Sequence, residues 1–250
     1  MKEFGLIGYP LDHAYSQKYF EEKFKKLGIS DAKYKLFPIS EISKITNIIN
    51  SYPNLIGLNV TTPYKELVIP YLNEVDDIIL RLGTVNTVKI TRTENSINTK
   101  GFNTDVFGLG KTFDNLKFPK DSKALILGSG GSGKTVSFVL KERNIKTLNV
   151  SRNPQNLQHI SYSNLTEAVI LQHNIIINAT PVGMFPNIVS FPNIPYKYIT
   201  KNHYCIDLVY NPAQTEFLKK CSDKGATTVN GLTMLYEQAD KAWDIWNSIL

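Results

Sequence analysis

Residues 124–135, with the sequence ALILGSGGSGKT, have the composition and spacing of a phosphate-binding loop. Gly128, Gly130 and Gly133 fit the G-x-G-x-x-G pattern of a dinucleotide-binding turn. The same stretch also satisfies the G-x-x-x-x-G-K-[ST] pattern of nucleoside triphosphatases. Both devices place glycines between an apolar strand and a helix whose first amides face an anion. The loop by itself therefore leaves both interpretations open.

The residues that follow the next predicted strand, 146–150, favour a dinucleotide. In a dinucleotide fold this strand ends at the adenosine ribose, where an acid binds the 2′-hydroxyl or an arginine accommodates a 2′-phosphate. The chain has Ser151, Arg152 and Asn153 here, and Arg152 follows the last loop glycine by about 20 residues, as the fingerprint requires. An arginine without an acid favours NADP over NAD as the cofactor.

A P-loop phosphotransferase is the alternative. Lys134 and Thr135 would then contact the phosphates and a magnesium ion, and an acid after a later apolar strand would hold the metal. Asp207, in the run YCIDLV, has that place in the sequence. These residues keep a phosphotransferase function open.

The composition is that of an ordinary globular protein. Of the 250 residues 42% are hydrophobic, and 28 basic against 22 acidic residues give a net charge of +6. Lysines alternate with acids along predicted helices such as 20–26, which indicates solvated faces rather than a nucleic-acid-binding stripe. The mild positive charge favours encounter with small anionic ligands.

The cysteines and the first residues predict a cytoplasmic location. Cys205 and Cys221 have no metal-ligand spacing and no disulfide pattern, so we expect a reducing compartment and no bound metal. Residues 1–10 contain only a short apolar run broken by glycines, from which we expect neither a signal peptide nor a membrane span.

Alternating strand and helix patterns predict an α/β fold with two domains. In the first part, strands are predicted at residues 3–8, 33–37, 55–60, 84–91 and 96–100. Helices are predicted around the apolar positions Tyr19, Phe20, Phe24 and Leu27, at 41–49, from Pro63 through Glu66, and from Asn103 to about Asn115.

The second part has the rhythm of a parallel sheet. Strands are predicted near Ala124, Leu148, Ile175 and Tyr204, with helical or looped crossovers between them. The proline-rich segment 182–198 predicts a long surface loop. A final helix is predicted over 231–250, with an apolar face of Leu235, Ala239, Ala242, Trp243 and Trp246.

Several longer motifs follow one another in the chain: GLNVTTPYKE, GTVNTV, GFNTDVFG, GSGGSG, SRN, NATPVGM, DLVYNP and NGLTMLYEQA. In these motifs and their order the sequence resembles the shikimate dehydrogenase family, nearly from end to end. The resemblance implies an N-terminal α/β substrate domain, 1–103, completed by a C-terminal helix in 234–250. It implies a Rossmann-type parallel-sheet domain for NADP over 104–233, in which Lys134 is an ordinary first-turn lysine.

The resemblance also implies an activity, the reversible NADPH-dependent reduction of 3-dehydroshikimate to shikimate in aromatic amino-acid biosynthesis. The family's catalytic lysine corresponds to Lys65 and its catalytic aspartate to Asp105. When a secondary alcohol gives a hydride to nicotinamide its hydroxyl proton must leave, and Lys65 would handle that proton. Asp105 would hold the ammonium and the reacting oxygen in place. The small-molecule substrate is the expected partner, and we expect a monomer or homodimer.

The remaining site residues are carried over from the family motifs. Substrate contacts implied are Ser16, Asn59, Thr61, Asn86, Tyr210 and Gln238. Cofactor contacts implied are Gly128, Ser129, Gly130, Gly131, Ser132, Ser151, Arg152, Asn153, Thr180, Leu208 and Gly231.

Two departures from the family pattern keep neighbouring functions open. Ala14 replaces the first of two serines that bind the substrate carboxylate, and Ser151-Arg152-Asn153 replaces asparagine-arginine-threonine at the 2′-phosphate. The alternatives are a quinate/shikimate dehydrogenase using NAD, and a non-catalytic ligand sensor on the same fold.

Overall fold

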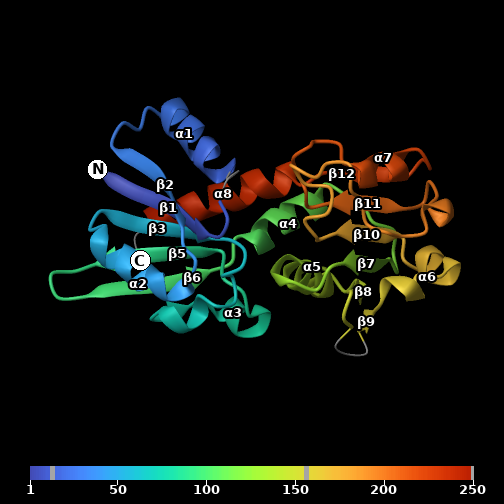
Figure 1. The fold of residues 1–250 in the computed structure, drawn as a ribbon, viewed down its shortest axis with the longest axis horizontal. Coiled ribbons are helices and arrows are strands. Elements are labelled where there is room, and N and C mark those ends of the chain that lie inside the picture. The colour runs from blue at the N-terminus through green and yellow to red at the C-terminus, as the bar shows by residue number, and fades with distance from the viewer. Residues whose placement is uncertain (12–14, 155–157, 249–250) are drawn as a thin grey trace. The chain divides into compact units, whose positions relative to one another are not determined.

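The computed structural model describes residues 1–11, 15–154 and 158–248 (Figure 1). The chain divides into two compact units. Unit 1 comprises Met1–Phe107 and Gln238–Leu250, and unit 2 comprises Gly108–Glu237. Each boundary falls inside a helix, α4 (Asp105–Asp114) and α8 (Leu232–Asn247). The two units are therefore described separately.

Unit 1 is built on a mixed six-stranded sheet of order β2-β1-β3-β5-β6-β4. The strands are β1 (Lys2–Gly8), β2 (Ala32–Pro38), β3 (Leu55–Val60), β4 (Glu74–Val75), β5 (Thr87–Arg92) and β6 (Ile97–Phe102). β1 runs parallel to both of its neighbours, whereas β5 is antiparallel to β3 and β6. Side chains alternate across β1, so that Phe4 and Leu6 enter one core cluster and Ile7 enters another.

Helices pack on both core clusters of unit 1. α1 (Tyr15–Leu27) and the C-terminal part of α8 bury aromatic and small side chains in the cluster around Phe4. The indole of Trp246 donates to the carbonyl of Val88 at 3.0 Å, which fastens α8 to β5. The other cluster holds side chains of α2 (Ile45–Ser51) and α3 (Asp77–Leu82).

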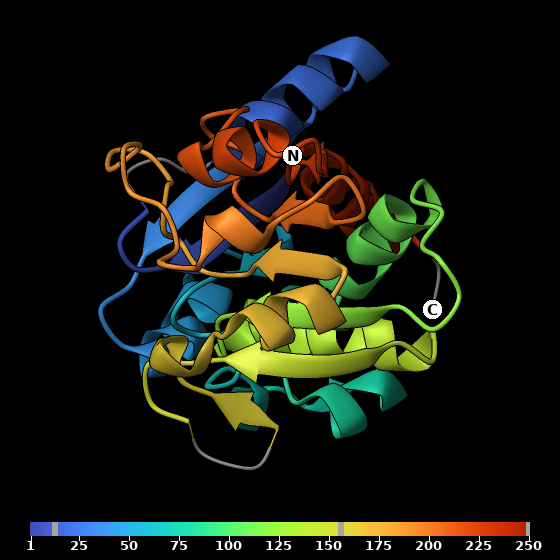
Figure 2. The same cartoon turned by 90° about the vertical axis from the view of Figure 1, so that its right-hand side faces the viewer.

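Unit 2 is built on an all-parallel six-stranded sheet of order β12-β11-β10-β7-β8-β9 (Figure 2). The strands are β7 (Lys123–Leu127), β8 (Lys146–Val150), β9 (His159–Ile160), β10 (Ile175–Asn178), β11 (Tyr204–Asp207) and β12 (Thr227–Val229). The chain builds outward from β7 to β9, then returns to β10 on the other side of β7. This reversal is the topological switch point at which doubly wound sheets bind ligands.

Three helices connect the strands of unit 2: α5 (Gly131–Glu142), α6 (Glu167–Gln172) and α7 (Glu216–Ser222). Burial explains the apolar strands, since Leu125, Ile126 and Ile176 are fully enclosed. The two-domain α/β class with a parallel dinucleotide-type sheet, predicted from the sequence, is confirmed.

Several local predictions were wrong. No α-helix begins at Pro63; residues 62–68 form turns that lead into a 3₁₀-helix, Ile69–Tyr71. The helical prediction for 41–49, in contrast, is confirmed, since a 3₁₀-helix, Ile42–Lys44, leads directly into α2. Leu27 is exposed rather than part of the apolar stripe of α1, because that helix ends there. The short elements β4, β9, β12 and α3 were not predicted.

Among the residues that the structure describes, none of the helices has both the length and the apolar character required to cross a membrane.

Candidate active site

Lys65 and Asp105 form an ion pair in unit 1. The Lys65 ammonium lies 2.6 Å from Asp105 Oδ2, and the two side chains are only 17% and 7% exposed. A lysine that merely sat on a solvated surface would not be held in this way. The Lys65 backbone is also fixed, because its carbonyl accepts a hydrogen bond from the Val85 amide at 2.7 Å.

Three adjacent strands bring the neighbours of this pair together. Asn59 on β3 pairs with Thr87 at the start of β5, and Thr87 pairs in turn with Phe102 at the end of β6. Asn86 precedes β5 directly, and Asp105 opens the helix that follows β6. Residues far apart in the sequence therefore meet at one end of one sheet.

Asn86 is the centre of this polar group. Its Nδ2 donates to Asp105 Oδ1 at 2.9 Å, while its Oδ1 accepts from the Thr104 amide at 2.7 Å. The Gln238 side-chain oxygen on α8 lies within 3.5 Å of Asn86 Nδ2. Both carboxylate oxygens of Asp105 thus accept hydrogen bonds, one from Lys65 and one from Asn86, which fixes the orientation of the carboxylate.

Asn59 is a buried residue that bonds to the neighbours of Asn86. It is 6% exposed, its Oδ1 accepts from the Tyr34 hydroxyl at 2.7 Å, and its Nδ2 donates to Thr87 Oγ1 at 3.3 Å. Its amide is occupied by protein partners at both ends. Tyr34 and Thr87 were missed at the sequence level, because a buried tyrosine or threonine within a strand has no distinctive pattern.

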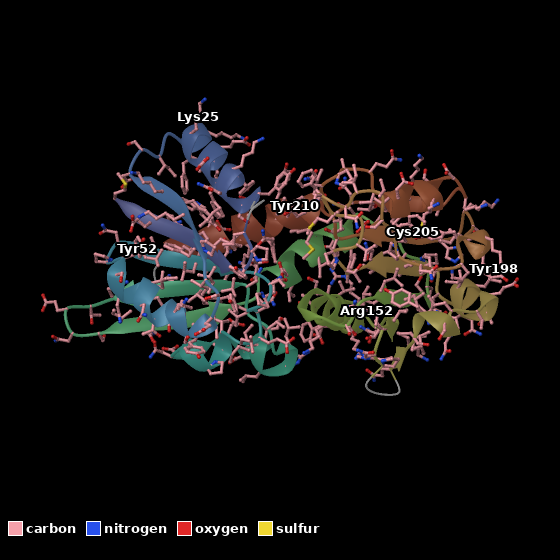
Figure 3. The ribbon with its side chains drawn as sticks, in the orientation of Figure 1. Lys25, Tyr52, Arg152, Tyr198, Cys205 and Tyr210 are labelled. Carbon is pink, nitrogen blue, oxygen red and sulfur yellow. The ribbon has the colours of Figure 1, made fainter. Side chains whose placement is uncertain are left out.

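The other predicted substrate residues lie in different places. Ser16, near the start of α1, contributes a side-chain hydrogen bond to Tyr34. Thr61 follows β3, and its amide donates to the Ile7 carbonyl at 3.0 Å. Tyr210 belongs to unit 2 (Figure 3), so the structure does not place it with the others. Ala14, the departure from the family pattern, lies outside the described residues.

The predicted cofactor residues follow four neighbouring strands of unit 2. Leu127, Val150, Asn178 and Asp207 end β7, β8, β10 and β11, and the register aligns Leu127 with Val150 and with Asn178, and Asn178 with Asp207. The segments that begin at Gly128, Ser151, Ala179 and Leu208 consequently leave the sheet along one edge. This is the carboxyl edge, at the switch point of the fold.

The glycine loop has the geometry that close approach of a phosphate requires. Gly128 has a φ of 115°, which residues with a side chain rarely adopt, and a Cβ on Gly133 would collide with the Gly128 carbonyl. A Cβ on Gly130 would meet no protein atom within 4 Å. Gly130 also caps α5 without a side-chain hydrogen bond, so the amides of its first turn are available for an anion. The loop therefore fits the pyrophosphate of a dinucleotide.

The tip of β8 carries the predicted 2′-phosphate residues. Ser151 Oγ lies 3.1 Å from Ser129 Oγ and accepts from the Asn153 amide at 3.2 Å. Arg152 is exposed, and its positive charge opposes the rise in the Tyr162 pKa that burial causes (Figure 3). An exposed guanidinium on the residue after Ser151, which contacts the glycine loop, is suited to a phosphate.

Thr180, one of the residues predicted at the nicotinamide end, is linked through Asn178 to the buried carboxylate of Asp207. Asp207 is fully buried and accepts from Asn178 Nδ2 at 2.9 Å and from Thr215 Oγ1 at 2.6 Å. Asn178 Oδ1 in turn accepts from the hydroxyl of Thr180 at 2.6 Å. Burial raises the pKa of Asp207 to about 6, although these hydrogen bonds oppose the rise.

Gly231 and Leu208 are in close contact in unit 2. A Cβ on Gly231 would collide with the Leu208 carbonyl, and the Gly231 amide donates to the Val209 carbonyl at 3.2 Å. Glycine is required there by the protein itself.

The P-loop alternative is wrong. Thr135 is fully buried and donates its hydroxyl proton to the Gly131 carbonyl at 3.0 Å, which keeps it from a magnesium ion. Asp207 has both oxygens occupied within the core. The G-K-T sequence is therefore the first turn of an ordinary helix.

The comparisons with known proteins agree with this geometry. Residues 6–88 match the family model described as "Shikimate dehydrogenase substrate binding domain". A Clostridium perfringens protein named shikimate dehydrogenase (NADP(+)) is 37% identical, over 100% of this chain and 93% of that protein. The chain belongs to the shikimate dehydrogenase family.

Solved structures of this family have the same fold. The crystal structure of shikimate dehydrogenase 1 from Peptoclostridium difficile superposes with a TM-score of 0.86 at 37% identity, covering 100% of this chain and 94% of the other. Quinate dehydrogenase from Corynebacterium glutamicum, in complex with NAD, gives 0.87 at 28% identity, covering 99% and 94%. Overall similarity therefore does not separate shikimate from quinate enzymes.

Proposed function

We propose that this chain is an NADP-dependent shikimate dehydrogenase that catalyses the reversible reduction of 3-dehydroshikimate to shikimate, a step of aromatic amino-acid biosynthesis. The ion pair of Lys65 and Asp105 is the observation that carries the proposal. An alcohol oxidation requires a group that exchanges a proton, and a nearly buried ammonium held by a carboxylate can supply one.

In the proposed mechanism Lys65 acts on the oxygen of the reacting carbon. NADPH, when bound, supplies the hydride to that carbon. As the carbonyl becomes an alkoxide, Lys65 Nζ donates a proton to the oxygen, and in the reverse direction it accepts the hydroxyl proton. Asp105 holds the ammonium at 2.6 Å and is itself fixed by Asn86. A catalytic group that is already oriented loses little entropy when the substrate binds.

Polar side chains would bind the hydroxyls and the carboxylate of the substrate. We assign these contacts to Ser16, Thr61, Asn86 and Gln238 of unit 1 and to Tyr210 of unit 2. Each substrate group loses water on binding and needs a partner in return. Asn59 was predicted as a contact, but its occupied amide supports a positioning role.

The NADP site is assigned to the carboxyl edge of the sheet in unit 2. Gly128, Ser129, Gly130, Gly131 and Ser132 would hold the pyrophosphate, Ser151, Arg152 and Asn153 the 2′-phosphate, and Thr180, Leu208 and Gly231 the nicotinamide end. In this proposal residues 1–103 and 234–250 form the substrate-binding domain, and residues 104–233 form the NADP-binding domain.

The competing substrates and cofactors are separated by initial rates. Shikimate and quinate are each offered with NADP and with NAD, and formation of reduced nicotinamide is followed by absorbance. The proposal predicts the highest kcat/KM for shikimate with NADP. A quinate/shikimate enzyme would use NAD at least as well, and a ligand sensor would form no reduced nicotinamide with any pair.

Arg152 is the residue on which the cofactor preference depends. Arg152→Ala is expected to raise the KM for NADP by roughly 10–100-fold, because a charge-assisted hydrogen bond is worth about 1.5–3 kcal/mol, and to leave the KM for NAD nearly unchanged. Lys146→Ala, at the opposite end of the same strand, is the matched control. Equal effects on NADP and NAD would contradict the assignment.

The proposal includes a cellular location and an oligomeric state. The two cysteines, Cys205 and Cys221, are free and buried, which fits a reducing compartment, and we propose a cytoplasmic enzyme. A monomer or homodimer remains the prediction for the oligomeric state.

A further inference from the structure

Tyr34 is a buried residue to which the proposed reaction assigns no role, although Ser16, one of the proposed substrate contacts, bonds to its side chain. Its hydroxyl lies within the core of unit 1, where it is 4% exposed and has its pKa raised by burial. It donates to Asn59 Oδ1 at 2.7 Å. The ring is already packed on Phe20 at a centroid distance of 4.7 Å, so phenylalanine would fill the same space. Packing therefore does not account for a hydroxyl at this position, and its hydrogen bonds must account for it.

The hydrogen bond from Tyr34 is the first of a directed series that ends at Asp105. Asn59 accepts at Oδ1 and so turns its Nδ2 toward Thr87 Oγ1, 3.3 Å away. The Thr87 hydroxyl thus accepts a hydrogen bond from Asn59. It has one hydrogen to donate, either to Asn86 Oδ1 at 3.1 Å or to Thr104 Oγ1 at 3.1 Å. Each hydroxyl or amide in the series donates in the same direction.

The last member of the series is the residue that orients the catalytic acid. Asn86 Oδ1 is held by the Thr87 hydroxyl and by the Thr104 amide, which leaves Nδ2 to donate to Asp105 Oδ1. The other Asp105 oxygen accepts from Lys65. If the Asn86 side-chain amide rotated by half a turn, its oxygen would face the Asp105 carboxylate and repel it. The arrangement of Asp105 and Lys65 would then change.

We propose that Tyr34 is a positioning residue for the proposed dehydrogenase, acting through Asn59, Thr87 and Asn86 to hold Asp105 and Lys65 in the arrangement that transfers the proton. Without its hydroxyl the buried Asn59 oxygen loses this donor. Turning the amide over to find another donor withdraws Nδ2 from Thr87 Oγ1 and from the Asn86 carbonyl, 3.4 Å away. The Thr87 proton then moves to Asn59, and Asn86 loses a donor that holds it.

The inference rests on the proposed function and is tested by Tyr34→Phe. The expected result is a kcat lowered about tenfold with a smaller change in the KM for shikimate, because a misplaced catalytic group slows the chemical step. The acidic or basic limb of the kcat profile against pH should also move. Tyr196→Phe, which removes the hydroxyl that donates to the Pro192 carbonyl in unit 2, is the control for losing a tyrosine hydrogen bond.

Thr87→Val gives an independent test of the same series. Valine keeps the shape but can neither accept from Asn59 nor donate to Asn86, so the same loss of kcat is expected. In the double variant, Tyr34→Phe should lower kcat no further, since its effect travels through the Thr87 hydroxyl. Additive losses would overturn the proposal. So would a Tyr34→Phe enzyme with the kcat and pH profile of the Tyr196→Phe control.

The wild-type enzyme separates the two levels of inference. If it does not oxidise shikimate with NADP, the proposed function fails. If it does, and Tyr34→Phe behaves as the control does, the function stands and the positioning role of Tyr34 fails.

Discussion

At the scale of single residues, the charge on Asp105 is what distinguishes this site from an ordinary polar cluster. Its side chain is 7% exposed, and its two oxygens accept from an ammonium and from an amide. Taking a carboxylate out of water costs several kcal/mol, which is offset only by well-placed partners. The ion pair with Lys65 and the hydrogen bond from Asn86 are the partners that offset this cost for Asp105.

Asp105→Asn is expected to lower kcat by roughly 10²-fold and to weaken shikimate binding to a smaller extent. Asparagine has no charge to hold the Lys65 ammonium. Its side-chain NH2 group would also face another hydrogen-bond donor in either orientation, Lys65 Nζ in one and Asn86 Nδ2 in the other. Steady-state rates with shikimate measure the effect. Asp114→Asn, on the same helix and paired with Arg143 at 2.8 Å on the surface, is the control. Equal rates for the two variants would contradict the role of Asp105.

At the scale of elements, the loop between β7 and α5 contains one glycine that the fold requires and one that the proposed cofactor requires. Gly133 is needed so that α5 can pack beside the Gly128 carbonyl, whereas Gly130 faces no protein atom. The same substitution at the two positions therefore separates folding from binding.

Gly133→Ala is expected to destabilise the protein by about 1–3 kcal/mol, since a Cβ forces the backbone of Gly128 to shift. Gly130→Ala should lower the thermal unfolding temperature only modestly, because alanine is a poorer helix cap than glycine. It should raise the KM for NADP by about tenfold or more, because the methyl group occupies space next to the pyrophosphate. Thermal unfolding and NADP titration measure the two effects. Normal NADP binding by Gly130→Ala would show that the cofactor does not use this loop.

Sequence patterns identified the glycine loop because its chemistry is local. The spacing of Gly128, Gly130 and Gly133 determines the turn, and the structure has the strand, turn and helix in that order. The same holds for strands such as β3, where an apolar run meets a buried sheet position. Local signals of this kind predicted most of the longer elements.

Local signals failed where tertiary contacts decide the backbone or the partners of a side chain. Pro63 is typical of a helix start, yet the chain turns there and the Lys65 carbonyl bonds to Val85 from the next segment. Tyr34 and Thr87 have a role only because strands distant in the sequence pair in a particular register. A sequence contains no pattern for a bond that depends on such pairing.

At the scale of the whole molecule, the two units have separate sheets and separate cores. The pair to which proton transfer is assigned lies in unit 1, and the residues assigned to the cofactor lie in unit 2. Unit 2 also contains a buried acid. Asp207 ties the ends of β10 and β11 to the segment that begins α7, through Asn178 and Thr215.

The raised pKa of Asp207 predicts a loss of stability as pH rises. Burial moves the pKa from 3.8 to about 6, so between these values the folded protein keeps a proton that the unfolded chain has released. The contribution of Asp207 to the free energy of unfolding therefore decreases from about pH 4 to pH 6, by on the order of 2–3 kcal/mol, and is constant above.

Urea unfolding followed by circular dichroism measures this contribution at about pH 4 and pH 7. Asp207→Asn cannot titrate, so the difference in unfolding free energy between wild type and variant isolates the group from all others. The stability of the wild type relative to the variant should be greater at the lower pH. A relative stability that is the same at both values, or greater at pH 7, would contradict the raised pKa.

The most direct test of the whole account is the rate at which Lys65→Ala forms NADPH from shikimate and NADP. Removal of the proton-transferring group is expected to lower kcat by at least about 10³-fold while the KM for shikimate changes little. Lys44→Ala, which removes a surface lysine that bonds only to Ser40 among the described contacts, should keep the wild-type rate. A Lys65→Ala enzyme with a near-normal kcat would contradict the central claim that Lys65 exchanges the proton of the reacting alcohol.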